Sequence, residues 1–229
     1  MKVSLNAPIS VVLLGAGLST RMGRCKALLP WRGKTVLESV CAAYEAVPGD
    51  RILVAGAEAA TMASLVAPFG FRTVVNPEPS LGQGHSLALG LSVLQQSGPV
   101  LCGVTDQPLL TARTVGQIMN FHEAARQLAP EPAVRIEQDA QVSGAEVNAW
   151  DCLITVPRYG AERSRGNPVL FGPYWRDPLG RLTGDEGGRV ILRGPGRSYI
   201  QFCDIAAAEG DDIDTPEAYA KLLAVWGTV

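Results

Sequence analysis

The sequence predicts a single α/β domain built as three α/β/α layers, Rossmann-like, with a mixed, mostly parallel sheet. The first observation is rhythm: short runs of β-branched and aliphatic residues alternate with helically periodic segments, as strands and crossover helices do. The second is composition, since 229 residues with 47% hydrophobic and 18% charged residues suit an ordinary globular core. The third is that no internal repeat and no linker between two cores is visible, so residues 1–229 are expected to form one domain.

The elements of the first half follow in a βαβα order. Buried strands are predicted at residues 9–14, 51–55, 72–75 and 100–104, and helices at 35–46, 58–66, 85–95 and 111–128. Ligands of parallel sheets bind at the carboxyl ends of the strands. The loops that begin at Gly15, Asn76 and Thr105 are therefore the places where a site is expected.

The second half is less regular. Residues 129–151 are polar and aperiodic, and we interpret them as an excursion from the domain. Strand-like runs return at residues 153–156, 168–171 and 199–203. Near the end, Thr215 can cap a last helix whose first position is Pro216.

Charge and cysteine usage exclude several classes of protein. A net charge of −2 gives no electrostatic footprint for nucleic acid or an anionic membrane, so a local basic patch is expected to serve a small ligand. Five scattered cysteines without a C-x-x-C pair predict reduced thiols and a cytoplasmic location. The first apolar run is short and ends in a glycine-rich turn, which favours a buried strand over a signal peptide.

The stretch after the first strand, LLGAGLSTRMGRCKALLPW, carries the clearest chemical signal. Glycines with free amides, the hydroxyl of Ser19 and the cations Arg21 and Lys26 can together surround phosphate oxygens. The stretch is not a P-loop, because no G-K-[ST] follows, and Thr20 stands where the dinucleotide fingerprint needs a third glycine. A tight turn in a solvated basic loop is the alternative interpretation.

These residues resemble the signature loop of the MobA-like nucleotidyltransferases, most of all the molybdenum cofactor cytidylyltransferase branch. The resemblance continues in the same order through GQGHSLALGL (82–91), TDQPLL (105–110), GNPVLF (166–171), LTGDEGGRVIL (182–192) and DIDTPEAYAKLL (212–223). It covers nearly the whole chain except the excursion and implies a fold of the nucleotide-diphospho-sugar transferase type. Gly15 departs from the usual alanine, and the excursion is longer than its counterpart in the family.

The resemblance implies a nucleotide site in the first two blocks. Arg21, Lys26 and Asp106 would be the catalytic residues, with the two cations on the triphosphate. Nucleotide contacts would come from Leu14, Gly15, Ala16, Gly17, Ser19, Arg21, Lys26, Gly82, Gly84 and Ser86. The residues at 82–86 also suit a helix start, where amides can meet a phosphate or a base. Plain capping of that helix remains the alternative.

A metal site is implied just beyond the fourth strand. Asp106 would be the main ligand of Mg²⁺ or Mn²⁺, because hard cations that bridge phosphates take one or two protein carboxylates. Asp212 and Asp214 flank Ile213, so in an extended segment both carboxylates face one side, and Asp214 is preferred as the second ligand. A capping turn is the competing interpretation for each aspartate.

The acceptor side is assigned by the later blocks. Arg165, Asn167, Thr183 and Asp185 would donate to or accept from an oxygen-rich pterin phosphate. His85 is expected at a helix start without a catalytic role, and His122 is expected to be solvated.

The resemblance thus implies CMP transfer from CTP to the phosphate of the molybdopterin-type molybdenum cofactor, with release of pyrophosphate. The partners would be the nucleoside triphosphate, that cofactor and a molybdenum-dependent oxidoreductase that receives the product. Two alternatives stay open: the same chemistry on a sugar or polyol phosphate, and a non-catalytic chaperone that delivers molybdenum cofactor.

Overall fold

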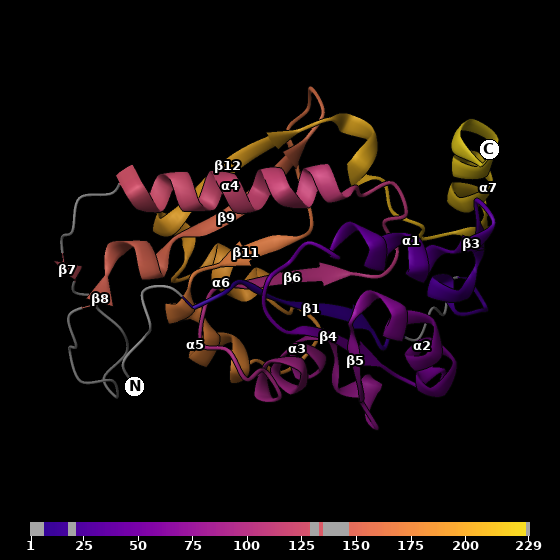
Figure 1. The fold of residues 1–229 in the computed structure, drawn as a ribbon, viewed down its shortest axis with the longest axis horizontal. Helices are drawn as coiled ribbons and strands as arrows, with labels where there is room; N and C mark the ends of the chain where they lie inside the picture. Colours follow the sequence, from indigo (N-terminus) through magenta and orange to yellow (C-terminus); the bar gives the residue numbers. More distant parts are fainter. Residues whose placement is uncertain (1–6, 18–21, 129–132, 135–146, 228–229) are drawn as a thin grey trace.

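The computed structural model describes residues 7–17, 22–128, 133–134 and 147–227 (Figure 1). The predicted contacts of Ser19 and Arg21 lie outside these residues, and so does most of the predicted excursion. Within the described ranges, no helix is both long and apolar enough to cross a bilayer.

The sheet has a parallel half that matches the predicted rhythm. Its strands are β1 (Ser10–Gly15), β4 (Arg51–Ala55), β5 (Arg72–Val75) and β6 (Val100–Val104), in the spatial order β5-β4-β1-β6. All neighbouring pairs among them are parallel, with Leu13 opposite both Leu53 and Gly103. The loops that follow β1 and β6 therefore lie side by side at the carboxyl ends of these strands.

The other half of the sheet is mixed. It contains β9 (Ile154–Tyr159), β10 (Ser164–Arg165), β11 (Val169–Phe171) and β12 (Ile200–Ile205). β11 is antiparallel to both β6 and β9, β10 is antiparallel to β9, and β12 runs parallel to β9. The segment from β9 through β10 to β11 is too short for a crossover helix, so β11 must run back along β9. The predicted mixed, mostly parallel sheet is confirmed.

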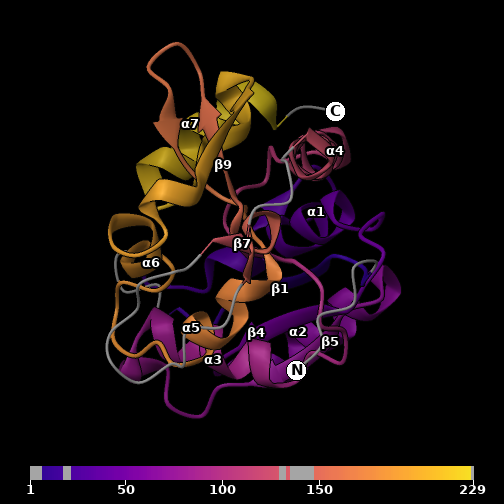
Figure 2. The same ribbon diagram turned by 90° about the vertical axis from the view of Figure 1, so that its left-hand side faces the viewer.

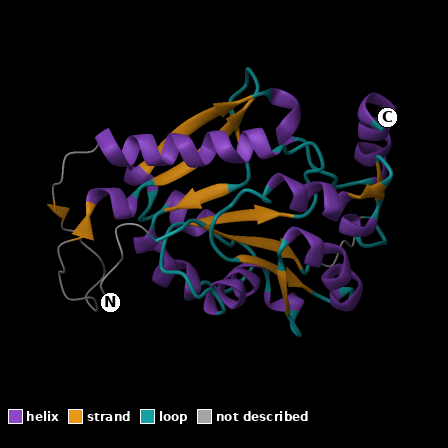
Figure 3. Ribbon diagram, viewed as in Figure 1, coloured by secondary structure: helices purple, strands orange, loops and turns teal. Residues whose placement is uncertain are grey.

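Helices cover both faces of the sheet (Figures 2 and 3). They are α1 (Val36–Ala43), α2 (Ala59–Val66), α3 (Gln83–Ser92), α4 (Ala112–Leu128), α5 (Arg176–Gly180), α6 (Arg189–Arg193) and α7 (Pro216–Trp226). Two small antiparallel strand pairs are separate from the main sheet, β2 (Pro30–Trp31) with β3 (Lys34–Thr35) and β7 (Ala133–Val134) with β8 (Val147–Asn148). α7 lies beside the β2–β3 pair, where the Tyr219 hydroxyl donates to the carbonyl of Pro30 at 2.5 Å.

Local capping chemistry sets the helix starts that the sequence predicts. The Thr35 hydroxyl accepts from the amide of Glu38 at 3.2 Å, and the Glu38 carboxylate accepts from the amide of Thr35 at 2.7 Å. This capping box starts α1 one residue after Thr35. Thr215 caps α7 in the same way, by accepting from the amide of Ala218 at 3.2 Å, with Pro216 in the first turn as predicted.

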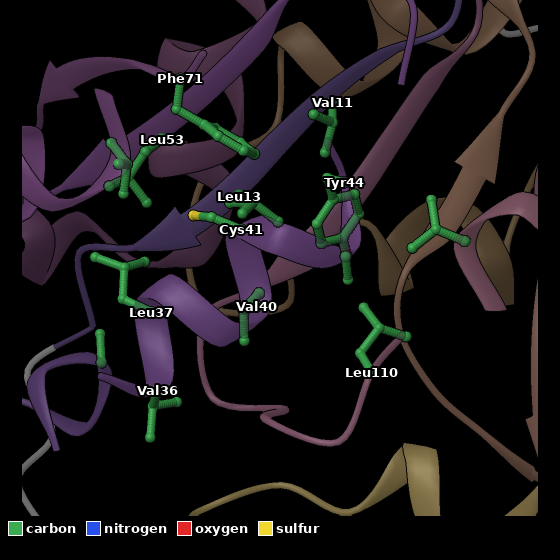
Figure 4. Close-up of a cluster of buried hydrophobic side chains, with 14 of the residues drawn as sticks. Val11, Leu13, Val36, Leu37, Val40, Cys41, Tyr44, Leu53, Phe71 and Leu110 are labelled. Carbon is green, nitrogen blue, oxygen red and sulfur yellow. The ribbon is translucent and has the colours of Figure 1, made fainter. Parts of the chain in front are cut away.

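Strand alternation divides the core in two. Val11 and Leu13 of β1 point toward α1, α2 and α4, into the cluster drawn in Figure 4. Val12 points to the opposite face, where it packs with Leu87 of α3 and Trp175. Because both faces of β1 are buried, the strand is held rigidly, and so is the position at which the glycine loop leaves the sheet.

His122 corrects one prediction. It is 2% exposed on the inner face of α4, whereas the sequence suggested a solvated side chain. Its Nδ1 lies 2.9 Å from the hydroxyl of Thr155 on β9, which also accepts from Gln201 at 2.8 Å. Polar partners inside the sheet therefore make this buried histidine possible. Trp150 is also buried, so the end of the predicted excursion packs on the domain.

The buried histidine predicts an acid-sensitive step in stability. Burial, reinforced by the charge of Arg126, lowers the pKa of His122 from 6.5 to about 4. Above pH 6.5 both the folded and the unfolded chain are neutral at this site. As the pH falls from 6.5 to 4, His122 takes up a proton only in the unfolded chain. The free energy of unfolding therefore falls by up to about 3 kcal/mol.

The variant His122→Gln keeps a polar group and cannot titrate, so it should lose less stability over this range. Urea unfolding at a series of pH values measures the difference. Burial raises the pKa of Asp151 to about 6, so this residue adds to the free energy of unfolding as the pH falls. Because Asp151 is present in both proteins, its contribution cancels when one profile is subtracted from the other. Parallel profiles for the protein and the variant would contradict the assignment.

Candidate functional site

Two adjoining cavities open where β1 and β6 end. The smaller, about 120 Å³, is lined by Leu14, Gly15, Gly17, Cys25, Lys26, Ala27, Thr105 and Asp106. The larger, about 370 Å³, is lined by Leu14, Ala16, Gly17, Pro79, Gly82, Gln83, Ser86, Val104, Asp106 and Asp185. They share Leu14, Gly17 and Asp106, so we treat them as one site with a Lys26 end and a Gln83 end. Both predicted blocks, the glycine loop and the start of α3, contribute to it.

The Lys26 end holds a cation between two carboxylates. The Nζ of Lys26 lies 2.5 Å from Oδ1 of Asp214 and 3.5 Å from Oδ2 of Asp106. These carboxylates come from segments more than a hundred residues apart, which the family resemblance had assigned to one metal site. Lys26 itself is fixed because Ala27 and Leu29, just beyond it, are 2% exposed.

Backbone contacts bring the two acidic segments together. The amide of Ile213 donates to the carbonyl of Asp106 at 2.9 Å, and the Gln107 side chain donates to the carbonyl of Gly210 at 3.2 Å. Ile213 is fully buried, so the side chains on either side of it, Asp212 and Asp214, are turned outward. The segment before α7 is thereby attached to the loop after β6.

The electrostatic balance of this end is negative. Burial raises the pKa of Asp106 to about 6; Lys26 opposes that rise, while Asp212 and Asp214 add to it. Burial and then Asp214 also raise the pKa of Asp212. Three carboxylates against one ammonium group leave a negative charge at this end, and carboxylate oxygens are the ligands that a hard divalent cation prefers. Within the described ranges, no three His, Cys, Asp or Glu side chains already lie in an arrangement that could hold a metal.

At the Gln83 end, two sequence blocks interlock. The amide of Gly84 donates to the carbonyl of Gly184 at 2.8 Å. A Cβ atom on Gly84 would lie 2.8 Å from the carbonyl oxygen of Thr183, and one on Gly82 would lie 2.4 Å from that of Gly184. Gly82 also has φ +94°, a conformation that suits only glycine. The glycines of GQGHS are thus required by the loop of residues 183–187, hereafter the 183–187 loop.

Three polar groups that the sequence suggested for ligand binding are hydrogen-bonded within the protein instead. The amide of Gly82 donates to the carbonyl of Pro79 at 3.2 Å, and that of Gly84 is used as described above. The buried hydroxyl of Ser86 accepts from the side chain of Asn76 at 2.9 Å. Gly82 and Ser86 line the larger cavity, and the polar groups of all three residues hold its wall together.

Three of the predicted acceptor residues line different cavities. Asp185 lines the larger cavity, and Thr183 contacts Gly84 through its backbone. Asn167 lines a third cavity of about 70 Å³, which shares Leu14, Gln83 and Val104 with the larger one. Arg165 instead lines a separate cavity beside Tyr159. The Cζ atom of its guanidinium group lies 4.9 Å from the centre of the Phe202 ring. Asp185 and Asn167 therefore line the site or a cavity that adjoins it, whereas the cavity that Arg165 lines shares no residue with either.

The structure also reveals residues that the sequence analysis did not single out. Gln83 lines both the larger cavity and the third one, and Thr105 and Cys25 line the Lys26 end. Gln107 positions the acidic segment. Gln83 could have been predicted as a site residue, because it lies inside the GQGHS block. The residues next to Gln107 give no indication of its contact with Gly210. His85 lies half-buried in the first turn of α3, as predicted for a helix start.

Comparison with known proteins places this geometry in a family. Residues 11–201 match the family model described as the MobA-like NTP transferase domain. Nicotine blue oxidoreductase of Paenarthrobacter nicotinovorans is 31% identical over 221 residues, covering 94% of this chain and 96% of that protein. The molybdenum cofactor guanylyltransferase of Xanthomonas euvesicatoria is 27% identical over 117 residues, covering 51% and 57%.

Solved structures show the same architecture. Rv0371c from Mycobacterium tuberculosis superposes with a TM-score of 0.71 at 26% identity, covering 95% of this chain and 98% of that one. The same protein has been solved in complex with manganese, with a TM-score of 0.69 at 25% identity. The fold is that of nucleotide-diphospho-sugar transferases, as predicted.

Proposed function

We propose a reaction from one premise: the chain belongs to the MobA-like NTP transferase family, and it is a nucleotidyltransferase. In the proposed reaction, CMP passes from CTP to the terminal phosphate of a molybdopterin-type molybdenum cofactor. An oxygen of the acceptor phosphate bonds to the α-phosphorus of CTP. The bond from that phosphorus to the bridging oxygen breaks, and pyrophosphate leaves with the electron pair.

The observation that carries this proposal is the Lys26 end of the site. An ammonium group held between Asp106 and Asp214, beside the backbone of Gly15 and Gly17, suits a triphosphate together with a cation. Asp106 and Asp214 would hold Mg²⁺ or Mn²⁺, which supplies charge neutralisation on phosphate oxygens when bound. Manganese in the related Rv0371c structure supports that choice.

The residues of this chain then act mainly by position and charge. Lys26 would bind the phosphates that leave, where negative charge grows during transfer. The loop after β1 would hold the triphosphate against the end of the sheet, and buried β1 and β6 keep it rigid. Asn167 and the third cavity, which adjoin the nucleotide cavity, would receive the acceptor. Such reactions depend on orientation and preorganised electrostatics more than on a side-chain nucleophile.

The deciding assay measures pyrophosphate release from CTP and Mg²⁺, with and without molybdenum cofactor. We expect release that depends on the cofactor, and cytidylylated cofactor as the product. Release with a sugar phosphate or polyol phosphate instead would keep the chemistry and replace the acceptor. Cofactor binding without any pyrophosphate release would instead favour a delivery chaperone.

A second candidate function has its own support in the 31% identity with an oxidoreductase over nearly the whole chain. An oxidoreductase would consume a reductant such as NADH or NADPH in the presence of an electron-accepting dye. The two functions are separated by following nicotinamide oxidation beside pyrophosphate release. We expect no nicotinamide oxidation, because two carboxylates and a lysine suit triphosphate chemistry and are not needed for hydride transfer.

The preference for a pyrimidine nucleotide can be tested at Ala16. This residue lines the larger cavity, yet it is only 5% exposed because it packs into the core beside the backbone of Gly56. A methyl group in such a contact discriminates by about tenfold to two-hundredfold. We expect kcat/KM to favour CTP over GTP, and Ala16→Gly to narrow that ratio without reversing it.

The readout is the ratio of kcat/KM for CTP and GTP, measured with the same acceptor. Preference for GTP in the unmodified protein would refute the cytidylyl assignment. An unchanged ratio in the variant would show that the methyl group of Ala16 serves packing alone.

A further inference from the structure

The two ends of the nucleotide site differ in charge, and this orients the nucleotide. Lys26 lies at one end, whereas the described residues that line only the larger cavity include no lysine or arginine. A triphosphate therefore belongs at the Lys26 end. The uncharged base then extends toward Gln83, and the ribose lies between them, near the shared residues Leu14 and Gly17. This orientation rests on the function proposed above.

A carboxylate stands at the base end. Asp185 lines the larger cavity, and its Oδ1 would lie 2.6 Å from a Cβ atom on Gly82, so it sits directly against the start of α3. In the part of the chain that the structure describes, this carboxylate has no hydrogen bond or ion pair. The backbone that carries this exposed side chain is held in place, because the adjacent carbonyl of Gly184 accepts from the amide of Gly84.

The chemistry of a carboxylate limits what it can recognise. An ionised Asp accepts hydrogen bonds and donates none, so it repels phosphates and attracts N–H or O–H groups. Cytosine presents an amino group at C4, whereas uracil presents a carbonyl oxygen in the same place. The neighbouring amide of Gln83 can donate or accept and so pairs with either base. Guanine also offers N–H donors, so Asp185 does not distinguish CTP from GTP.

We propose that Asp185 is a specificity residue that binds the exocyclic amino group of cytosine and thereby selects CTP against UTP. The ribose is the other source of donors near a nucleotide site. The hydroxyls of the ribose would lie beside the residues that line both cavities, and Asp185 lines only the larger one. Opposite uracil, the carboxylate faces the O4 carbonyl, acceptor against acceptor, with no compensating bond.

The test measures nucleotide binding to the full chain by calorimetry with CTP, UTP and deoxy-CTP in the presence of Mg²⁺ and without an acceptor. We expect the unmodified protein to bind CTP at least about tenfold more tightly than UTP. Asp185→Asn keeps the shape, and its amide can donate to O4, so the ratio should fall by about tenfold. Glu186→Gln is the matched control, since Glu186 is the adjacent acid, carries the same charge, pairs at 3.7 Å with Arg193 and does not line the cavity.

Each other outcome overturns the inference. Equal loss of CTP and UTP binding in Asp185→Asn would assign the carboxylate to general positioning. A changed ratio of CTP to deoxy-CTP would assign it to the ribose. An equal change in Glu186→Gln would reduce the effect to net charge. If the protein turns over CTP but Asp185→Asn leaves the ratio of CTP affinity to UTP affinity unchanged, only this inference fails. If neither nucleotide binds, the proposed function fails as well.

Discussion

Replacing Asp106 with alanine is expected to lower the rate of pyrophosphate release by at least about a hundredfold, the loss typical of one electrostatic group that acts in the transition state. Asp106 is the only aspartate that lines both the Lys26 end and the Gln83 end among the residues that the structure describes. Its removal leaves Lys26 paired with Asp214 at 2.5 Å, so no buried cation is stranded. Single-turnover assays over a range of Mg²⁺ and Mn²⁺ concentrations measure the effect.

The fold of this variant should survive. The backbone carbonyl of Asp106, which accepts from the amide of Ile213, is unchanged by the substitution. Asp177→Ala is the matched control, because Asp177 is an exposed aspartate on α5 that lines none of the cavities at the site. Turnover close to normal in Asp106→Ala, with an unchanged melting temperature, would remove Asp106 from the catalytic machinery.

Replacing Lys26 with methionine is expected to reduce kcat/KM for CTP by about tenfold to a thousandfold. The substitution keeps the apolar stem and removes the ammonium group, which is a point charge near the phosphates that leave. If its interaction strengthens as charge moves onto pyrophosphate, kcat should fall as well as the affinity for CTP. Stopped-flow measurement of the chemical step beside calorimetry separates the two effects.

Lys34→Met serves as the control for Lys26. Lys34 belongs to β3, is exposed and lies outside the cavities that form the site. Loss of CTP affinity with an unchanged chemical step would restrict Lys26 to binding. Unchanged affinity and rate would show that its pairing with Asp106 and Asp214 is structural only.

Features encoded by local chemistry were predictable from the sequence. Thr215 was predicted as a cap from its place before Pro216, and the structure confirms it. The capping box of Thr35 and Glu38 starts α1 within one residue of the predicted helix start. The strand at Arg51–Ala55 follows from a continuous apolar run with buried faces on both sides. The meeting of Asp106 with Asp214 was implied by resemblance, since two segments so distant in sequence have no local signal for contact.

Features that depend on long-range packing were not predictable. His122 carries a helical pattern that does not reveal its burial, because its partner Thr155 lies on a strand in the other half of the sheet. Arg165 and Asn167 stand two positions apart but line different cavities, because Arg165 pairs with β9 whereas Asn167 lies between β10 and β11. The contact of Gly84 with Gly184 is made by backbone atoms, which leave no side-chain pattern in either block.

That backbone contact has a consequence for anyone who recombines members of this family. Because a Cβ atom on Gly82 or Gly84 would lie 2.4 Å or 2.8 Å from backbone atoms of the 183–187 loop, a segment from a relative that carries a side chain at either position would not fit against this loop. A chimaera with such a parent must carry both segments from it, although about a hundred residues separate them. Directed libraries that vary Gly82 to Ser86 should likewise vary Thr183 to Gly187 in the same molecules, or most of their members will lose the nucleotide cavity before its selectivity can change.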